Sequence, residues 1–396
     1  MTTTTSDSTT GASVTPARPL AVAAVAAGSF TIVTSEMLPV GLLTPIGAEL
    51  GVSDGTAGLM MTAPGLVAAV SAPLTTLAAR RLDRRAVLCR LMALLAAANL
   101  LAALAPVYPV MLAARVLTGV SIGGFWAFAV ALAVRLAPEP LVGRAAATIA
   151  SGIAVASVLG VPAGTFVSSV AGWRAAFAAV ALLAVVLCVA LARLLPPLPA
   201  ERAARLSDLW RVWRTGPLRV VLVVTALLVT GHFAAYTYVR PFLEQAAGAG
   251  ATAVSAVLLG YGVAGVAGNF AAGAQAGRRP RGVLVTLALL IGGATAVLAA
   301  APASIGPATA LLVLWGVAYG GVSVTLQMWI VRAGGGEAGT AMLTGVFNAA
   351  ISLGALAGGR VLDGVSVFAV MWLGARLSLA AAAVAGMSGR RRTNGS

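Results

Sequence analysis

The sequence predicts an all-α integral membrane protein with twelve transmembrane helices arranged as two six-helix pseudo-repeats. Three observations predict this fold class. The composition is 60% hydrophobic and only 9% charged over 396 residues, the apolar residues fall into long runs, and one half of the chain resembles the other. Typical soluble domains are roughly 45–50% apolar and 25% charged. So few charges cannot cover the surface of a soluble protein of this length, and we expect the protein's partner to be the lipid bilayer.

Twelve apolar runs follow one another along the chain. Each reaches the roughly 20 residues that a helix needs to cross the hydrocarbon core of a bilayer. The connections are short and leave little room for a soluble domain. The runs lie at 19–46, 56–79, 86–106, 108–134, 145–170, 174–196, 219–243, 252–276, 282–302, 305–331, 337–359 and 364–387.

The arginines predict how these helices are oriented. Every basic residue is an arginine, and with the N-terminus inside, 21 of the 26 fall on the inner side, whereas the outer loops carry only Arg174, Arg240 and Arg360. This asymmetry is the positive-inside rule, and it predicts that both chain ends are cytoplasmic in a bacterial inner membrane. The net charge of +15 therefore reports topology, and we expect no nucleic-acid partner.

An offset of 197 residues relates the two halves. "RVLTGVSIGGFWAFAVALAVR" at 115–135 aligns with "LVLWGVAYGGVSVTLQMWIVR" at 312–332, and Gly65 aligns with Gly262. Parallel six-helix repeats describe the major facilitator architecture. The predicted units are a disordered cytoplasmic N-terminus at 1–18, a bundle at 19–193, a cytoplasmic linker at 194–218, a second bundle at 219–387 and a cytoplasmic tail at 388–396.

Four strings resemble one family, the twelve-helix drug:proton antiporter branch of the major facilitator superfamily, and within it bacterial sugar-efflux and chloramphenicol-resistance-type exporters. The strings are "TSEMLPVGLLTPIGAELGVSDGTAGLM" (34–60), "SGIAVASVLGVPAGTFVSSVAGWRAAF" (151–177), "TGHFAAYTYVRPFLEQAAG" (230–248) and "NAAISLGALAGGRVLD" (348–363). The resemblance implies secondary active export of a small organic molecule in exchange for protons.

The fifth predicted helix carries a stripe of glycines. Gly152, Gly160 and Gly164 recur at spacings of eight and four, which places them on one helix face, and Pro162 can kink the helix there. The resemblance implies that this antiporter motif makes a tight contact between the halves that resists leak. Ordinary packing of neighbouring helices is the alternative, and it uses the same residues.

The loop between the second and third helices departs from the family pattern. It reads "AARRLDRR" at 78–85, so Arg80 occupies the usual acid position and Asp83 the usual glycine position. The inner-gate ion pair that the resemblance implies is therefore in question. We expect Asp83 to pair either with the eleventh helix or with Arg81, Arg84 and Arg85.

Glu36 is the only one of the eleven acids that lies well inside a predicted helix. Ionisable groups inside a membrane are costly, and they mark proton or ion pathways. We therefore predict that Glu36 carries protons. The alternative is an acid at a helix end, bonded to backbone that Pro39 leaves free.

Two further ionisable residues are predicted to act with Glu36. The offset pairs the only histidine, His232, with Ser35, so His232 is expected to share the proton or to bind substrate. A structural hydrogen bond to a neighbouring helix is the alternative. Arg115 resembles the family's fourth-helix arginine, which is tied to proton coupling, and the alternative is a side chain that snorkels to the outer surface. Arg376 has no obvious acidic partner.

Polar and aromatic residues inside the predicted helices suggest a substrate cavity. Such a lining suits a neutral, hydroxylated or amphipathic small molecule, whereas each polar residue alone can simply join two helices. Drug, sugar and nucleoside are all compatible with it. The candidates are Tyr236, Tyr238, Asn269, Gln327, Asn348, Trp126 and Trp315.

The sequence argues against other functional classes. It holds no P-loop, no paired acids, no nucleophile–histidine arrangement and no zinc-type spacing, so we expect no enzyme, no cofactor and no metal, with the proton gradient as energy source. Cys89 and Cys188 are not expected to form a disulfide, and we expect a monomer. A proton-independent facilitator or an uptake symporter of the same fold remains the alternative.

Overall fold

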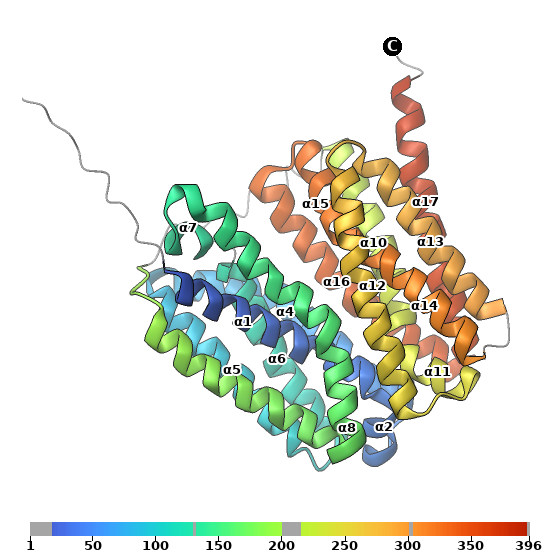
Figure 1. Ribbon diagram of the computed structural model, residues 1–396, viewed down its shortest axis with the longest axis horizontal. Helices are drawn as coiled ribbons and strands as arrows, with labels where there is room; N and C mark the ends of the chain where they lie inside the picture. Colours follow the sequence, from blue (N-terminus) through green and yellow to red (C-terminus); the bar gives the residue numbers. More distant parts are fainter. Residues whose placement is uncertain (1–17, 130–131, 200–214, 301–303, 394–396) are drawn as a thin grey trace, which may run out of the picture.

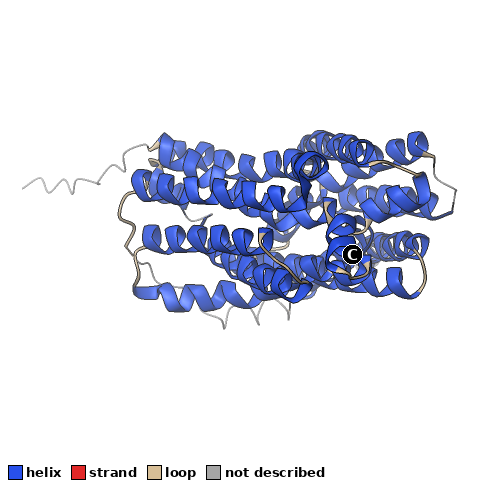
Figure 2. Cartoon of the chain, turned by 90° about the horizontal axis from the view of Figure 1, so that it is seen from below, coloured by secondary structure: helices blue, strands red, loops and turns tan. Residues whose placement is uncertain are grey.

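The protein, seen here as a computed structural model, is described at residues 18–129, 132–199, 215–300 and 304–393. The regular structure of these residues is helical (Figure 1), and most helices run side by side along one direction (Figure 2). An α-helix satisfies its own backbone hydrogen bonds, which is why it suits a chain surrounded by lipid. The predicted all-α class is confirmed.

The first half holds the elements between residues 19 and 194. Pro19 opens the first helix, at a position where its missing N–H costs nothing. The elements are α1 (Pro19–Met37), η1 (Leu38–Gly41), α2 (Leu43–Leu50), α3 (Asp54–Ala57), α4 (Leu59–Ala78), η2 (Ala79–Arg81), α5 (Arg84–Ala103), α6 (Tyr108–Ala129), α7 (Leu132–Leu136), η3 (Glu139–Leu141) and α8 (Val142–Leu194).

The second half holds the elements from residue 216 onwards. They are α10 (Gly216–Tyr236), α11 (Val239–Ala247), α12 (Ala251–Ala276), α13 (Pro280–Ala300), α14 (Ile305–Gly320), α15 (Val322–Arg332), α16 (Gly336–Gly364) and α17 (Val367–Thr393). The last helix thus continues to Thr393, beyond the expected start of the tail. Residues 1–17 and the linker residues 200–214 lie outside the described part of the chain.

The described residues form eleven candidate membrane spans, and one of them is long enough to cross the membrane twice. The span Glu139–Leu194 has 56 residues, about 80 Å of helix, whereas the hydrocarbon core is about 30 Å thick. Gly172 breaks it with a φ of 81°, a conformation that glycine adopts at little cost. The chain therefore crosses the membrane twice between 139 and 194. The prediction of twelve transmembrane helices is confirmed.

The two halves lie next to each other and approach most closely near α2 and α11 (Figure 1). One buried apolar cluster lies within the first half, and a second lies mainly in the second half but includes Val40, Met61 and Val161 of the first. A third cluster joins both halves, since it contains Leu42 and Phe177 from the first half and Tyr238 and Val370 from the second. We call this region, with η1, α2, α3 and α11, the α2–α11 end. The opposite end carries Arg18 and Thr393, the first and last described residues.

Two glycines of the pseudo-repeat mark the interface between the halves. Gly65 on α4 faces Ser352 on α16, and Gly262 on α12 faces the backbone of Val158 on α8. At either glycine a Cβ atom would overlap the facing helix. The 197-residue offset superimposes these two glycines, so equivalent helices make equivalent close contacts on both sides of the interface.

Candidate functional site

Glu36 lies in the last turn of α1 and is 6% exposed. Its carboxylate has no hydrogen-bond or ion-pair partner among the described residues, although it interacts electrostatically with Arg115 and Tyr319. The alternative interpretation was an acid at a helix end, bonded to backbone freed by Pro39: the position at the end of α1 is confirmed, whereas the bond to that backbone is not present. That backbone oxygen belongs to Ser35, and it accepts a hydrogen bond from Arg115.

Arg115 is fully buried on α6 and bonds three backbone carbonyl groups. Its Nη1 donates to Ser35 O (2.8 Å), its Nη2 to Glu36 O (3.0 Å) and its Nε to Met60 O (3.0 Å). Ser35 and Met60 each precede a proline, Pro39 and Pro64, by four residues. A proline has no N–H to pair with the carbonyl four residues earlier. Arg115 therefore supplies donors that the two prolines lack.

This geometry corrects one alternative for Arg115. A snorkelling side chain would place its guanidinium at the outer surface, whereas all three donor directions here end on buried carbonyls. Arg115 also fixes the backbone on which Glu36 sits, because it holds both the Ser35 and the Glu36 carbonyls. The role of Arg115 in proton coupling stays a prediction.

His232 lies on α10, 1% exposed, at the centre of an aromatic cluster. The indole Nε1–H of Trp315 on α14 donates to His232 Nδ1 at 3.0 Å. Because an indole nitrogen is a donor only, Nδ1 must be the unprotonated nitrogen of this ring. The expected structural hydrogen bond to a neighbouring helix is thus present, and it leaves Nε2 as the nitrogen that carries the proton.

Four rings form a continuous stack through this cluster. Tyr261 on α12 stacks on Tyr236 (centroids 4.8 Å apart, 26° between planes), Tyr236 on His232 (5.1 Å, 19°) and His232 on Tyr319 of α14 (3.3 Å, 4°). Trp315 meets three of these rings nearly edge-on. Edge-to-face contacts of this kind favour a rigid arrangement. We call Tyr261, Tyr236, His232 and Tyr319 the ring stack.

One end of the ring stack lies within electrostatic range of Glu36. Tyr319 forms one end of it, is half-buried, and interacts electrostatically with Glu36 on the other half of the molecule. The hydroxyl group of Tyr261, at the other end, is buried and has no partner among the described residues. The repeat predicted that His232 and Glu36 occupy adjacent equivalent positions, and Tyr319 stacks on His232 while it interacts electrostatically with Glu36.

Sequence reasoning missed Tyr261 and Tyr319. The usable signal was the scarcity of tyrosine, since the chain has five and three of them belong to the ring stack. Of the predicted cavity residues, the structure brings Tyr236 and Trp315 to His232. The remaining five lie elsewhere.

Tyr238 belongs to the α2–α11 end and not to the ring stack. It is fully buried, and its hydroxyl donates to Ala355 O at 2.6 Å. Trp126 on α6 makes an edge contact with Phe125 inside the first half. Asn348 on α16 donates to Thr344 O of its own helix at 3.0 Å. Asn269 and Gln327 are half-buried on α12 and α15, and no bond of theirs to the ring stack is seen.

The glycine stripe of α8 packs against α1 and η1 of the same half. A Cβ at Gly152 would overlap the Ala26 carbonyl, one at Gly160 would lie 2.9 Å from Thr34 Oγ1, and one at Gly164 would overlap Leu38. The expectation that this stripe lies between the halves is therefore wrong. The helix faces the other half with Ser157 and Val158 instead, against Gly262. Pro162 is buried inside α8, and an antiporter-specific role stays a prediction.

Asp83 also differs from expectation. It is the N-cap of α5, where its carboxylate accepts from the backbone N–H groups of Arg85 (2.7 Å) and Leu198 (2.9 Å). Among the described residues, its hydrogen-bond partners are thus these two backbone groups, and no bond to the eleventh helix or to an arginine side chain is seen. A side-chain acceptor at this position satisfies N–H groups that the helix itself cannot.

The arginines of this loop have separate surroundings. Arg84 donates to Ala79 O at 2.8 Å and lies over the Phe128 ring, and Arg85 bonds the Ala192 carbonyl. Arg81 is exposed, and the side chain of Arg80 lies outside the described part. Far from this loop, Arg376 is exposed on α17, inside the candidate span Val367–Ser388, and no acidic partner of it is seen among the described residues.

Comparison with known proteins gives relatives along most of the chain. The chain is 34% identical to the Transcription regulatory protein OpdE of Pseudomonas aeruginosa over 68% of each chain. It is 32% identical to the uncharacterized MFS-type transporter YfhI of Bacillus subtilis over 89% of each. It is 30% identical to the purine ribonucleoside efflux pump NepI of Salmonella typhimurium over 63% of each.

Structural and family comparisons agree with these relatives. The fold matches the crystal structure of the nucleoside transporter NupG with a TM-score of 0.73, at 13% identity, over 93% of this chain and all of that one. The family model of the Major Facilitator Superfamily matches residues 25–359. The chain is therefore a multi-pass membrane transport protein that belongs to the Major Facilitator Superfamily.

Proposed function

We propose that this protein exports a small organic molecule from the cytoplasm in exchange for protons. One observation carries the proposal: among the described side chains, Glu36 is the only buried carboxylate, and it has no hydrogen-bonding partner. A group in this position can gain or lose a proton without breaking a bond to the protein. Acids inside membrane proteins commonly mark proton relays.

In the proposed cycle, the α2–α11 end faces the outside and both chain ends are cytoplasmic. When the outer side is open, Glu36 takes a proton and substrate is released. When the inner side is open, the carboxyl group gives its proton to the cytoplasm and substrate binds again. The two halves rock about the interface marked by Gly65 and Gly262. Arg115 holds the end of α1, so that Glu36 keeps its position through the cycle.

For the substrate we propose a molecule with a planar ring, such as a nucleoside. The ring stack supports this substrate class. Tyr319 lies at the end of the stack and is half-buried, and His232 covers only one of its two ring faces. A flat ring can add to such a stack through aromatic contact. A relative of this chain is a purine ribonucleoside efflux pump. The competing substrate classes are sugars and amphipathic drugs.

Transport into everted membrane vesicles tests the proposal. The probes are a purine nucleoside, a planar cationic drug and a disaccharide, each offered with and without a pH gradient. We expect gradient-driven uptake of a planar compound by the wild type. Glu36→Gln should abolish uphill transport and its pH dependence, while downhill exchange persists.

The matched control is Glu49→Gln, because Glu49 is an acid of the same half that lies half-exposed on α2. It should transport like the wild type. Uphill transport by Glu36→Gln with an unchanged pH profile would contradict proton coupling through Glu36. Transport that ignores a collapsed gradient in the wild type would instead favour a facilitator.

A further inference from the structure

The α2–α11 end is closed by a carboxylate that bonds the opposite half. Asp363 lies in the last turn of α16. Its Oδ2 accepts from the hydroxyl of Ser53 at 2.7 Å, and its Oδ1 accepts from the backbone N–H of Gly55 at 3.0 Å. Ser53 and Gly55 belong to the first half, at the start of α3. One side chain of the second half therefore holds two groups of the first.

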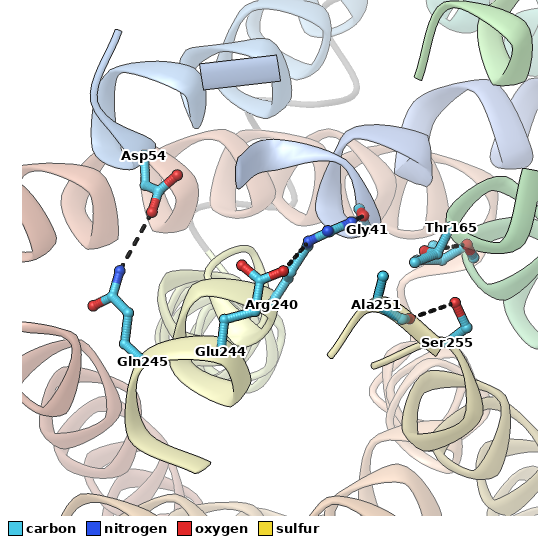
Figure 3. Close-up of polar contacts among 9 residues, drawn as sticks. Gly41, Asp54, Thr165, Arg240, Glu244, Gln245, Ala251 and Ser255 are labelled. Atoms are coloured by element: carbon cyan, nitrogen blue, oxygen red, sulfur yellow. Dashed lines mark hydrogen bonds and ion pairs between the residues drawn. The ribbon is translucent and has the colours of Figure 1, made fainter. Parts of the chain in front are cut away.

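Residues of α11 add two further bonds between the halves (Figure 3). Arg240 donates through Nη1 to the Gly41 carbonyl and through Nε to Glu244 Oε1 at 2.8 Å on its own helix. Gln245 Nε2 lies 3.5 Å from Asp54 Oδ2. These four bonds between the halves all lie at the α2–α11 end.

At the opposite end the comparable acid is used differently. Asp83 bonds the backbone of Arg85 and Leu198, and both partners lie in its own half. Among the described residues, it makes no bond to α16. The polar contacts therefore favour closure at one end of the molecule.

The closed end is also built so that it can open. A cavity of about 440 Å³ lies beside Asp363 and is lined by Asp54, Gln245, Ser366 and Phe368, among others. It brings space for water next to the carboxylate. Asp54 is repelled by both Asp363 and Glu244, which opposes closure, and is attracted by Arg240, which favours it. This attraction and the bonds to Ser53 and Gly55 must together outweigh the repulsion.

We propose that the Asp363 carboxylate is the latch that keeps the outer side closed when no substrate is bound. Its two bonds exist only while Ser53 and Gly55 lie against α16. They are charge-assisted, and such bonds are stronger than those between neutral groups. On opening, water replaces both partners, so the latch favours closure by a moderate factor, about tenfold. The resting protein is accordingly open towards the side of its chain ends.

Spin-label distances test this latch without any transport. Cys89 and Cys188 are replaced by serine, and labels are placed at Val107 and Val365, two exposed positions at the α2–α11 end, one on each half. Electron–electron distance distributions are recorded for the purified full chain with no substrate. We expect one short distance in the parent protein. Asp363→Asn should raise the ratio of long to short distances about tenfold.

Ser53→Ala should raise the same ratio by a smaller amount, and the double variant should add little to Asp363→Asn alone, because both residues form one contact. Glu49→Gln is the matched control: its carboxylate bonds Trp173 and Arg174 within the first half, and its distances should not change. Unchanged distances in both Asp363→Asn and Ser53→Ala, with chromatographic behaviour like the parent, would overturn the latch. So would an equal shift in Glu49→Gln. Neither result depends on substrate or protons, so the latch can fail while the proposed function stands.

Discussion

Arg115 Nη1 lies 2.8 Å from the carbonyl oxygen of Ser35, the oxygen that Pro39 leaves without a helical partner. The same side chain holds Met60 O, which Pro64 leaves free in the same way. One arginine thus supplies the hydrogen bonds that two prolines leave unmade, and it connects α6 to both α1 and α4. This explains how a cation can be fully buried without an acid bonded to it, because three carbonyl dipoles surround it.

Replacing Arg115 with lysine should destabilise the protein. An ammonium group is a single point of charge and cannot match the planar fork that reaches three carbonyl oxygens. At least one carbonyl is then left unpaired, which costs on the order of 2 kcal/mol. The measurement is the thermal unfolding midpoint in detergent, which should fall. Arg376→Lys, at an exposed position, is the control and should leave the midpoint unchanged. An unchanged midpoint in Arg115→Lys would show that the three carbonyl groups do not need the planar guanidinium group.

Changes at Tyr319 should separate its ring from its hydroxyl. Tyr319→Ala removes the end of the ring stack and should weaken binding of a planar nucleoside about three- to tenfold, as expected for one aromatic contact. Tyr319→Phe keeps the ring and should bind nearly as well as the wild type. Binding is measured by calorimetry or by fluorescence titration on purified protein. Phe270→Ala, a ring on α12 that is 73% exposed, is the control. Equal losses in all three variants would contradict a stacked substrate.

A side chain at Gly262 should keep the α2–α11 end from closing. In Gly262→Val the new Cβ would overlap the backbone of Ser157 and Val158 on α8. The halves cannot approach as they do here, so the long spin-label distance between positions 107 and 365 should dominate. Gly260→Val is a close control two residues away, because its Cβ would meet only Val313 Cγ2, at 3.6 Å. A short distance in Gly262→Val would mean that α8 can shift to make room.

The pair between Glu49 and Trp173 predicts a pH-dependent contribution to stability. The Trp173 indole N–H donates to Glu49 Oε2 at 2.6 Å, and Arg174 also bonds the carboxylate. These bonds hold the pKa of Glu49 below its usual value of 4.5. The folded state therefore favours the ionised form, so the contribution is fully present above pH 4.5 and is lost as the pH falls through the lowered pKa.

Glu49→Gln should accordingly lower the unfolding midpoint slightly at pH 7. The effect is at most about 1 kcal/mol, because the pair is half-exposed and screened by water. The difference from wild type should shrink as the pH is lowered below 4.5. Glu139→Gln, at an exposed acid of η3, should show no such trend. A difference that stays constant with pH would rule out the carboxylate as its cause.

The sequence by itself determined the class of the molecule. Helix spans follow from the length of apolar runs, and the two-part architecture follows from matches at a single offset, such as Gly65 with Gly262. Both signals are local or periodic along the chain, so they can be recognised without knowing which helices are in contact. The isolation of Glu36 among the acids was equally visible, because it depends only on position within a run.

Only the tertiary structure decided what these residues touch. The stripe at Gly152, Gly160 and Gly164 marks a close helix contact, but nothing along the chain says that α1 fills it. Arg115 needed partners from two other helices, and Tyr319 joined the ring stack through a residue 87 positions earlier in the chain. Asp363 lies at the end of α16, and only the folded chain brings Ser53 of the other half to its carboxylate. A helix face presents the same residues to any neighbour, and the choice of neighbour is made by the packing of the whole bundle.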